Sequence, residues 1–447
     1  METIELTAGH VWTMVCAGLV LLMTPGLAFF YGGLTRAKAS LNMMMMSFVS
    51  IGLVAVVWVL WGYNMSGGEG ILQLFASPFA DFGLYGALGT EDLIGIGFGA
   101  TFAIITVALI SGAIADRAKF STWVVFVPIW VTAVYCPLAF MVWGGGLLSA
   151  DGFIGSAVGE AIDFAGGLVV HIAAGVAALV LALLLGKRKG FGVDPGHRPH
   201  NIPFVMLGAA LLWFGWFGFN GGAAADATQA GLIWVNTLAA PAAAMLGWLL
   251  TERVRGKRAT SIGSASGIVA GLVAITPACA YVDPVGALII GFLSGAACAL
   301  AVGLKYKLGF DDSLDVVGLH LVAGILGTVM IGLLGLPMED GRAGLFYGGD
   351  ASLLMAQVVA VVVAVVYTAI VTFIIGIALK ATMGWRVTAE EEELGLDQSL
   401  HSEIAYEFGG GGMGTSYAET VDTGEQQQIA GARAAEPAPE TEAVRVQ

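Results

Sequence analysis

Charged residues are scarce in this sequence of 447 residues, since only 12% of them are Asp, Glu, Lys or Arg. Soluble domains usually contain about 25% charged residues, so the composition excludes an ordinary water-soluble chain. Apolar runs of about 20 residues recur instead, which is the length that an α-helix needs to cross a bilayer. The short alternating segments of an outer-membrane barrel are also lacking. The sequence therefore predicts an all-α polytopic protein of the cell membrane.

Cysteine is also rare, and the four cysteines are Cys16, Cys136, Cys279 and Cys298. All four lie in apolar runs without metal-ligand spacing, which predicts buried small side chains and no disulfide framework. We expect no metal and no cofactor. No nucleophile paired with a base is recognisable either, so we predict that the protein is not an enzyme.

Basic residues are outnumbered by acidic ones, and the formal net charge is -14. This balance argues against nucleic-acid binding. The N-terminus has no basic segment before its first apolar run. We therefore interpret that run as a retained membrane span and not as a cleaved signal peptide.

Eleven membrane spans are predicted, and the 65 glycines suit their close packing. The spans cover approximately 8–32, 40–63, 93–115, 120–145, 160–186, 201–222, 227–250, 261–281, 284–304, 314–335 and 351–380. If the N-terminus lies outside, the loops after odd-numbered spans carry every Lys and Arg except Arg342. Because basic loops stay in the cytoplasm, we predict an N-out, C-in orientation.

Three regions follow from composition. Residues 1–385 form the predicted membrane domain, and residues 386–408, which include four consecutive glutamates, are predicted to be a tail that docks on the cytoplasmic face. Residues 409–447 are rich in Gly, Gln, Ala, Glu and Pro, which is typical of a disordered segment.

Two intramembrane histidines follow aspartates at the same interval. The two segments read Asp163-Phe-Ala-Gly-Gly-Leu-Val-Val-His171 and Asp312-Ser-Leu-Asp-Val-Val-Gly-Leu-His320. Ionisable groups are costly in hydrocarbon, so each histidine is a candidate functional residue. The alternative for each histidine is a core residue bonded to a backbone carbonyl, and the alternative for each aspartate is a helix N-cap.

The matched intervals fall in spans 5 and 10, so spans 1–5 and 6–10 are predicted to be two halves of a repeat. Span 1 ends in Phe30-Tyr-Gly-Gly33 and span 6 in Phe219-Asn-Gly-Gly222, which supports the same division. Because each half has an odd number of spans, the second half must be inverted relative to the first, as in many transporters. The symmetry brings the two histidines together near mid-membrane.

These motifs together resemble the ammonium transporter family (Amt/Mep/Rh), and most closely its Amt branch. The stretches that carry the resemblance are Pro25 to Gly33, Asp163 to His171, Gly215 to Asn220 and Asp312 to His320, and it extends over about residues 8–408. The resemblance implies a homotrimer of eleven-span subunits, each with its own conduction path. It also implies that residues 386–408 are a cytoplasmic regulatory tail, and that a trimeric PII-type signalling protein at the cytoplasmic face is a further partner.

The resemblance also assigns roles to single residues. Trp143 with Phe102 resembles the outer recruitment site, Phe102 and Phe219 resemble two stacked rings that block the outer pore, and His171 and His320 resemble the twin histidines. Trp216 lies beside the pore, Asp163 near its outer end, and Asp312 is expected to shape the inner vestibule. Ala223 stands where the family often has a serine, which removes one hydrogen-bond acceptor.

The function expected from these residues is transport of ammonium. Ammonium is recruited by the aromatic site, loses its proton near Asp163, and crosses as ammonia past the phenylalanines and the histidine pair. Aromatic faces attract a desolvated cation, but a bare cation in a dry apolar pore is very costly. An ammonium sensor on the same scaffold is the alternative, and passive gas conduction as in the Rh branch is disfavoured by Trp143.

Overall fold

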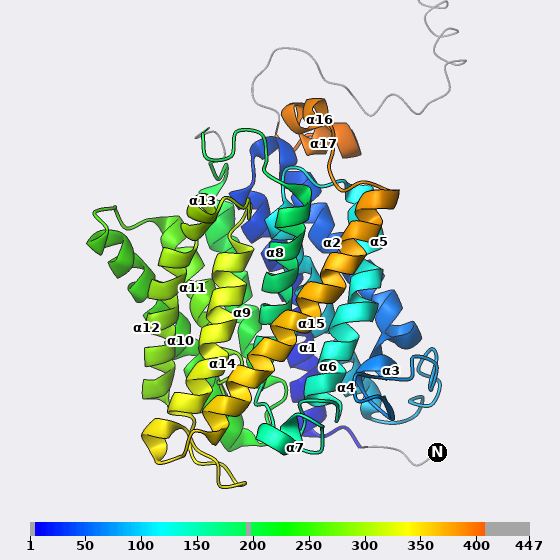
Figure 1. Cartoon of the computed structure of the whole chain (residues 1–447), viewed down its shortest axis with the longest axis vertical. Coiled ribbons are helices and arrows are strands. Elements are labelled where there is room, and N and C mark those ends of the chain that lie inside the picture. Colours follow the sequence, from blue (N-terminus) through cyan, green and yellow to red (C-terminus); the bar gives the residue numbers. More distant parts are fainter. Residues whose placement is uncertain (1–4, 194–197, 407–447) are drawn as a thin grey trace, which may run out of the picture. The chain divides into compact units, whose positions relative to one another are not determined.

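The computed structural model describes residues 5–193 and 198–406. Within these residues the protein is built mainly from long helices that run side by side (Figure 1). The short helices α16 (Ala389–Leu394) and α17 (Leu396–His401) lie at the end of the bundle opposite α7 (Gly155–Val158). The segment predicted to be disordered, 409–447, lies outside the described residues.

The first half of the chain contains α1 (Ala8–Leu34), η1 (Ala37–Ala39), α2 (Ser40–Val57), η2 (Trp58–Gly62), α3 (Tyr63–Ser66), β1 (Gly70–Ile71), β2 (Phe75–Ala76), α4 (Asp92–Ile110), η3 (Ser111–Ile114), α5 (Phe120–Trp130), η4 (Val131–Tyr135), α6 (Cys136–Trp143), η5 (Gly167–Ile172) and α8 (Ala173–Leu185). The second half contains α9 (Ile202–Gly221), α10 (Ala227–Val254), α11 (Ser261–Ile275), α12 (Pro284–Ala301), α13 (Leu304–Leu308), η6 (Val317–Leu321), α14 (Val322–Leu334), η7 (Leu345–Tyr347) and α15 (Ser352–Thr382).

Ten of the described helical segments are long and apolar enough to cross a membrane, and they coincide with ten of the predicted spans. The multi-pass helical membrane fold is therefore confirmed. The remaining predicted span, 261–281, corresponds to α11, which is apolar but only 15 residues long. Its helix ends at Ile275, because Pro277 has no N–H to continue the hydrogen-bond ladder. An eleventh crossing and the N-out orientation stay predictions.

Two spans begin later than predicted. The span expected from residue 160 is helical only from Gly167, and the span expected from residue 314 only from Val317. In the first, Gly166 takes a left-handed conformation with φ of 111°, which glycine adopts without steric cost. The chain before each of these helices is therefore extended or turned, and an aspartate side chain satisfies the free N–H groups at the helix start.

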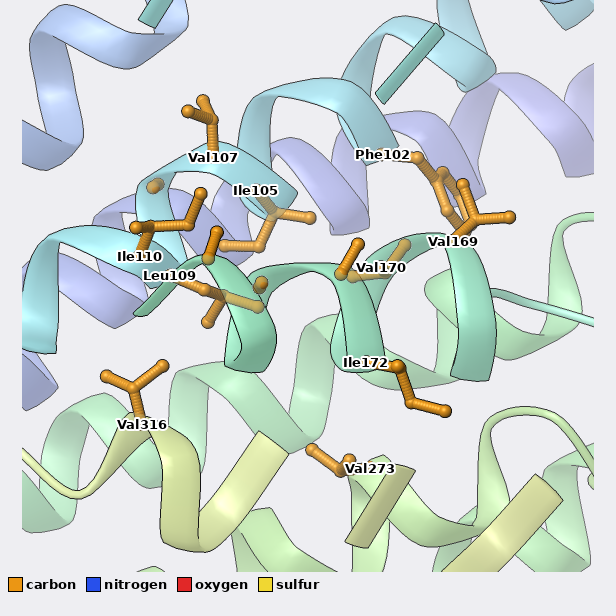
Figure 2. Close-up of a cluster of buried hydrophobic side chains, with 14 of the residues drawn as sticks. Phe102, Ile105, Val107, Leu109, Ile110, Val169, Val170, Ile172, Val273 and Val316 are labelled. Carbon is orange, nitrogen blue, oxygen red and sulfur yellow. The ribbon is translucent and has the colours of Figure 1, made fainter. Parts of the chain in front are cut away.

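Close approach of helices depends on glycine where the two halves meet. A Cβ on Gly208 of α9 would lie 2.3 Å from the backbone nitrogen of Phe30 in α1, and one on Gly215 would lie 2.3 Å from Cγ of Met23. Small residues at such contacts let membrane helices pack backbone to backbone. Figure 2 shows the apolar packing further inside, where Ile105 of α4 and Val170 of η5 lie in one buried cluster.

Candidate functional site

A cavity of about 250 Å³ lies among α4, α6 and the segment before η5, and we call it the outer aromatic cavity after the predicted orientation. Its lining residues are Trp58, Phe98, Gly99, Phe102, Tyr135, Trp143, Phe164, Ala165, Phe219 and Ala223. The indole N–H of Trp58 donates to the carbonyl of Ile96 at 2.9 Å, and that of Trp143 donates to the carbonyl of Asp163 at 2.7 Å. These bonds fix both rings without using a polar group inside the cavity.

Two stacked phenylalanines form the inner wall of this cavity. The rings of Phe102 and Phe219 lie 4.2 Å apart at an interplanar angle of 20°. Trp143 stands edge-on to Phe102, with 6.5 Å between the ring centroids. Phe219 is fully buried and Phe102 nearly so, whereas Trp143 is 42% exposed. The series of rings therefore begins at the exposed Trp143 and ends at the buried Phe219.

The two histidines meet directly behind the phenylalanines. Nδ1 of His171 and Nδ1 of His320 are 3.3 Å apart, and the two rings are 5.3 Å apart at 27°. Because one nitrogen must donate and the other accept, the two neutral rings carry different tautomers. Nε2 of His171 is buried and bonds to no other described residue. This nitrogen is a buried polar group that the pair leaves free.

Both aspartates cap the helices that carry the histidines. The Asp163 carboxylate accepts four backbone N–H bonds, from Gly166, Gly167, Leu168 and Val169, at 2.5 to 3.2 Å. The Asp312 carboxylate accepts two, from Val316 and Val317. Both carboxylates therefore satisfy N–H groups at the helix start, as a capping residue does, although Gly166 and Val316 occupy the N-cap positions themselves. The first turns are π-helical, since the N–H of His171 bonds to the carbonyl of Gly166 five residues earlier, and such turns often occur at functional sites.

A chain of hydrogen bonds holds Trp216 against the histidine pair. The Trp216 ring stacks on His171 at 5.4 Å and 23°, and its indole N–H donates to the hydroxyl of Thr276 at 2.8 Å. That hydroxyl donates to the carbonyl oxygen of Leu272 at 2.8 Å and lies 3.3 Å from Oδ1 of Asn220, whose amide donates to Thr237 at 3.0 Å. These polar side chains are buried, so the network fixes the Trp216 ring.

Replacing Thr276 by valine tests this network. The variant keeps the side-chain shape but leaves the Trp216 N–H without its acceptor, and an unpaired buried donor costs about 1–3 kcal/mol. We expect a lower melting temperature in detergent and a smaller substrate-evoked current than in wild type. The Thr276→Ser variant keeps the hydroxyl and should behave like wild type. Equal stability and current in all three proteins would contradict the role of the network.

A narrow apolar cavity continues from the histidines toward the other end of the bundle. Its volume is about 10 Å³, and Leu27, Tyr31 and Leu109 are among the residues that line it. The Tyr31 hydroxyl donates to the carbonyl of Leu109 at 2.9 Å. The sequence did not single out Tyr31, although it lies inside the quoted Phe30-Tyr-Gly-Gly33 motif. Thr276 was also missed, because no local motif marks it.

The structure thus brings together six of the eight candidate residues: Trp143, Phe102, Phe219, Trp216, His171 and His320. Asp163 lies beside the cavity through its bond from Trp143. Asp312 lies apart from the rings, where its backbone carbonyl accepts a hydrogen bond from the ammonium group of Lys305 at 2.8 Å.

The segment predicted to be a tail contacts the loops at its end of the bundle. Glu392 of α16 accepts hydrogen bonds from the side chain of Arg386 and from the backbone N–H of Lys189, both at 2.7 Å. Asp397 of α17 accepts from the N–H groups of Leu41 and Asn42 at the start of α2. Residues 386–401 are therefore tied to the membrane-spanning part of the chain by specific contacts.

A bundle of apolar helices long enough to cross a membrane, with a file of aromatic rings and a buried histidine pair inside it, is typical of a membrane transport protein. The family comparison identifies it further. The model of the Ammonium Transporter Family matches residues 11–406, and this chain belongs to that family. It is therefore classed with transporters and not with enzymes.

Relatives and solved structures agree with this assignment. The ammonium transporter of Mycobacterium tuberculosis is 50% identical over 429 residues, covering 89% of this chain and 90% of the relative. The ammonium transporter of Aquifex aeolicus is 45% identical over 409 residues, covering 90% and 93%. The crystal structure of Candida albicans Mep2 is similar with a TM-score of 0.78 and 32% identity, covering 86% and 87%. A structure described as a sensor Amt protein has a TM-score of 0.81 and 28% identity, covering 90% and 100%.

Proposed function

We propose that the protein recruits ammonium at the outer aromatic cavity, removes a proton, and conducts ammonia through the apolar pore past His171 and His320. One observation carries the proposal: the rings form an unbroken file. Trp143 contacts Phe102, Phe102 stacks on Phe219, Phe219 lies 6.0 Å from His171, and His171 contacts His320. A substrate that follows this file passes from exposed rings to buried imidazoles.

The energetics of the file favour ammonia as the species that crosses. Moving a bare cation into apolar surroundings costs far more than moving a neutral molecule with the same number of heavy atoms. Beyond the phenylalanines the cavity is about 10 Å³ and mostly apolar, so it has no room for a hydration shell. The free Nε2 of His171 can form a hydrogen bond with ammonia, because ammonia both donates and accepts hydrogen bonds.

Deprotonation is expected near Asp163, with the proton passing to solvent water at the open side of the cavity, where Trp143 is exposed, and not onto the Asp163 carboxylate. Each of its two oxygens already accepts two backbone N–H bonds, so protonation would weaken the cap that holds the His171 helix. Its negative charge lies at the start of η5, two residues from the cavity-lining Ala165, where it favours the arrival of a cation. Asp163 therefore supports recruitment and shapes the outer end of the pore. Asp312 shapes the inner vestibule, because its carboxylate caps the start of the helix that carries His320.

Ammonium pulses applied to proteoliposomes containing the purified protein test the proposal. We expect an ammonium-dependent transient current, or a pH change coupled to ammonium flux, that empty liposomes do not give. If neither signal exceeds that of empty liposomes, the transport proposal fails. The current also reports whether the proton follows ammonia and makes transport electrogenic.

A sensor role on the same scaffold is the second candidate function, and similarity to the structure described as a sensor Amt protein favours it. A sensor that binds ammonium without moving it would change its tryptophan fluorescence on ammonium addition and give no flux. A flux in the liposome assay would favour the transporter.

The family membership also supports a homotrimer and a PII-type partner at the cytoplasmic face, with the N-terminus outside. Mass measurement of the protein in detergent tests the trimer, and a monomer in mild detergents would oppose it. Pull-down from cells shocked with ammonium tests the partner, and no recovery under any nitrogen regime would count against it.

A further inference from the structure

We infer that Gln357 of α15 is a positioning residue of the outer pore mouth, because its side chain fixes the backbone that carries Asp163 and the acceptor of the Trp143 indole. The inference rests on the proposed function, since it takes the outer aromatic cavity as the entrance of the ammonium path. It adds to that entrance a residue of the last span, which belongs to neither predicted half of the repeat.

Gln357 is fully buried, and its amide group bonds to the backbone of a residue 195 positions earlier in the chain. The amide oxygen accepts the N–H of Ile162 at 2.7 Å, and the amide nitrogen donates to the carbonyl of the same residue at 2.7 Å. The amide nitrogen also donates to the carbonyl of Thr328 at 3.2 Å, in the helix that follows His320. One side chain therefore joins the segment that leads to His171 with the helix beyond His320.

The segment that Gln357 holds has no regular structure of its own. Ile162 lies between α7 and η5, where no helix or strand supplies partners for the backbone, and a buried backbone group without a partner is costly. On the other side of Asp163, the N–H of Phe164 donates to the carbonyl of Pro277 at 3.2 Å. Asp163 is thus placed by one contact immediately before it and one immediately after it.

The place of Asp163 sets the geometry of the outer mouth in two ways. Its carbonyl accepts the indole N–H of Trp143 at 2.7 Å, and its carboxylate accepts four N–H groups at the start of η5, which carries His171. A shift of the backbone at Ile162 therefore moves both the ring and the helix start. A misplacement of about 1 Å in such a site can cost about a hundredfold in rate.

The inner mouth has an equivalent contact of different charge. Asp311 stands directly before Asp312, as Ile162 stands before Asp163, and its carbonyl accepts a hydrogen bond from the guanidinium of Arg117 at 2.6 Å. A guanidinium at the outer mouth would oppose an arriving cation, and it has no acceptor for the N–H of Ile162. The neutral amide holds both backbone groups without adding positive charge to the entrance.

The test measures ammonium-evoked current in proteoliposomes over a range of ammonium concentrations for wild type and Gln357→Leu. We expect the half-saturating concentration to rise about tenfold, because the recruitment geometry is lost. Thr372→Val is the matched control, since it removes a buried hydrogen bond from the Trp130 indole on the same helix. It should lower the melting temperature and leave the half-saturating concentration unchanged. An unchanged value in Gln357→Leu, or an equal rise in Thr372→Val, would overturn the inference.

Gln357→Glu tests the hydrogen bonds themselves and replaces the leucine variant if that one does not fold. A protonated carboxyl can accept from the N–H of Ile162 and donate to its carbonyl, whereas an ionised one can only accept. The current relative to wild type should therefore be high at about pH 5 and fall as the pH rises to about 8. Glu160, Asp163 and Arg342, the charged groups nearest Ile162 on the page of contacts, are the same in both proteins, so the ratio isolates the new carboxyl. A variant no better than Gln357→Leu at any pH would contradict the inference.

Absence of any ammonium signal from wild type would overturn the proposed function instead. Hydrogen exchange of the purified proteins then still decides the positioning claim. The N–H groups at the start of η5 should exchange at least about tenfold faster in Gln357→Leu than in wild type, and at the wild-type rate in Thr372→Val. Equal exchange in all three proteins would overturn the positioning role.

Discussion

Replacing Asp163 by alanine is expected to abolish ammonium transport. The change removes the acceptor of four backbone N–H bonds at the start of the helix that carries His171. Each buried N–H left without a partner costs about 1–3 kcal/mol. The first turn should rearrange, and with it the Trp143 ring, whose indole bonds to the carbonyl of the same residue. The measurement is the ammonium-evoked current per unit of protein in proteoliposomes.

Asp163→Asn is the matched control. It keeps the shape and one carbonyl oxygen, so it can satisfy two of the four N–H groups, and its amide group adds donors that face other donors. We expect a current between those of wild type and alanine. An alanine variant that is stable in detergent and conducts at the wild-type rate would show that the cap is dispensable.

The largest expected loss of stability follows from replacing Asp311 by alanine. Both oxygens of this fully buried carboxylate accept hydrogen bonds from the side chain of Arg188, at 2.9 and 3.0 Å, and Arg188 also pairs with Asp116 at 3.1 Å. The variant removes the negative charge that pairs with the buried guanidinium groups of Arg188 and Arg117. Breaking a buried pair in this way costs about 3–5 kcal/mol. A thermal melt in detergent should show a clear downward shift.

The pH dependence of that loss has a definite sign. Burial by itself would raise the pKa of the Asp311 carboxyl, but hydrogen bonds and charge from Arg188 outweigh it and hold the pKa below its usual value. The pair therefore stabilises the fold above the unfolded-state pKa of about 3.9 and loses its effect as the pH falls through the lower folded-state pKa. The difference between wild type and Asp311→Ala should be constant near neutral pH and shrink in acid.

An exposed ion pair provides the control. Lys189 and Glu393 also form a salt bridge, but both side chains are more than half exposed. Pairs of this kind contribute little to stability. Glu393→Gln should leave the melting temperature within error of wild type, and a shift as large as that of Asp311→Ala would contradict the burial argument.

The fold was predictable because a helix needs about 20 apolar residues to cross the hydrocarbon core of a bilayer. Ten spans followed from runs of apolar residues, and the boundaries at Ala8 and Phe120 agree with the predicted ones. The predicted span boundaries were wrong where a single side chain overrides the apolar pattern of the sequence. Asp163 and Asp312 delay their helices through side-chain caps, and Pro277 ends α11 early, although the surrounding residues remain apolar.

The candidate site was predictable where a motif or the symmetry marked it. The matched intervals led to His171 and His320, whose nitrogens lie 3.3 Å apart in the structure. Contacts between distant segments were not predictable. The bond from Trp216 to Thr276 joins residues 60 positions apart, and the position of Tyr31 depends on the packing of α1 against α4.

The most direct test of the central claim compares ammonium and potassium in the double variant His171→Ala/His320→Ala. Potassium resembles ammonium in size but has no proton to lose, so a pore that selects by deprotonation must exclude it. Currents evoked by each ion should be recorded from wild-type and variant proteoliposomes prepared with equal protein. We predict that wild type responds to ammonium alone, whereas the variant also conducts potassium. A variant that conducts ammonium and excludes potassium as well as wild type does would contradict the account.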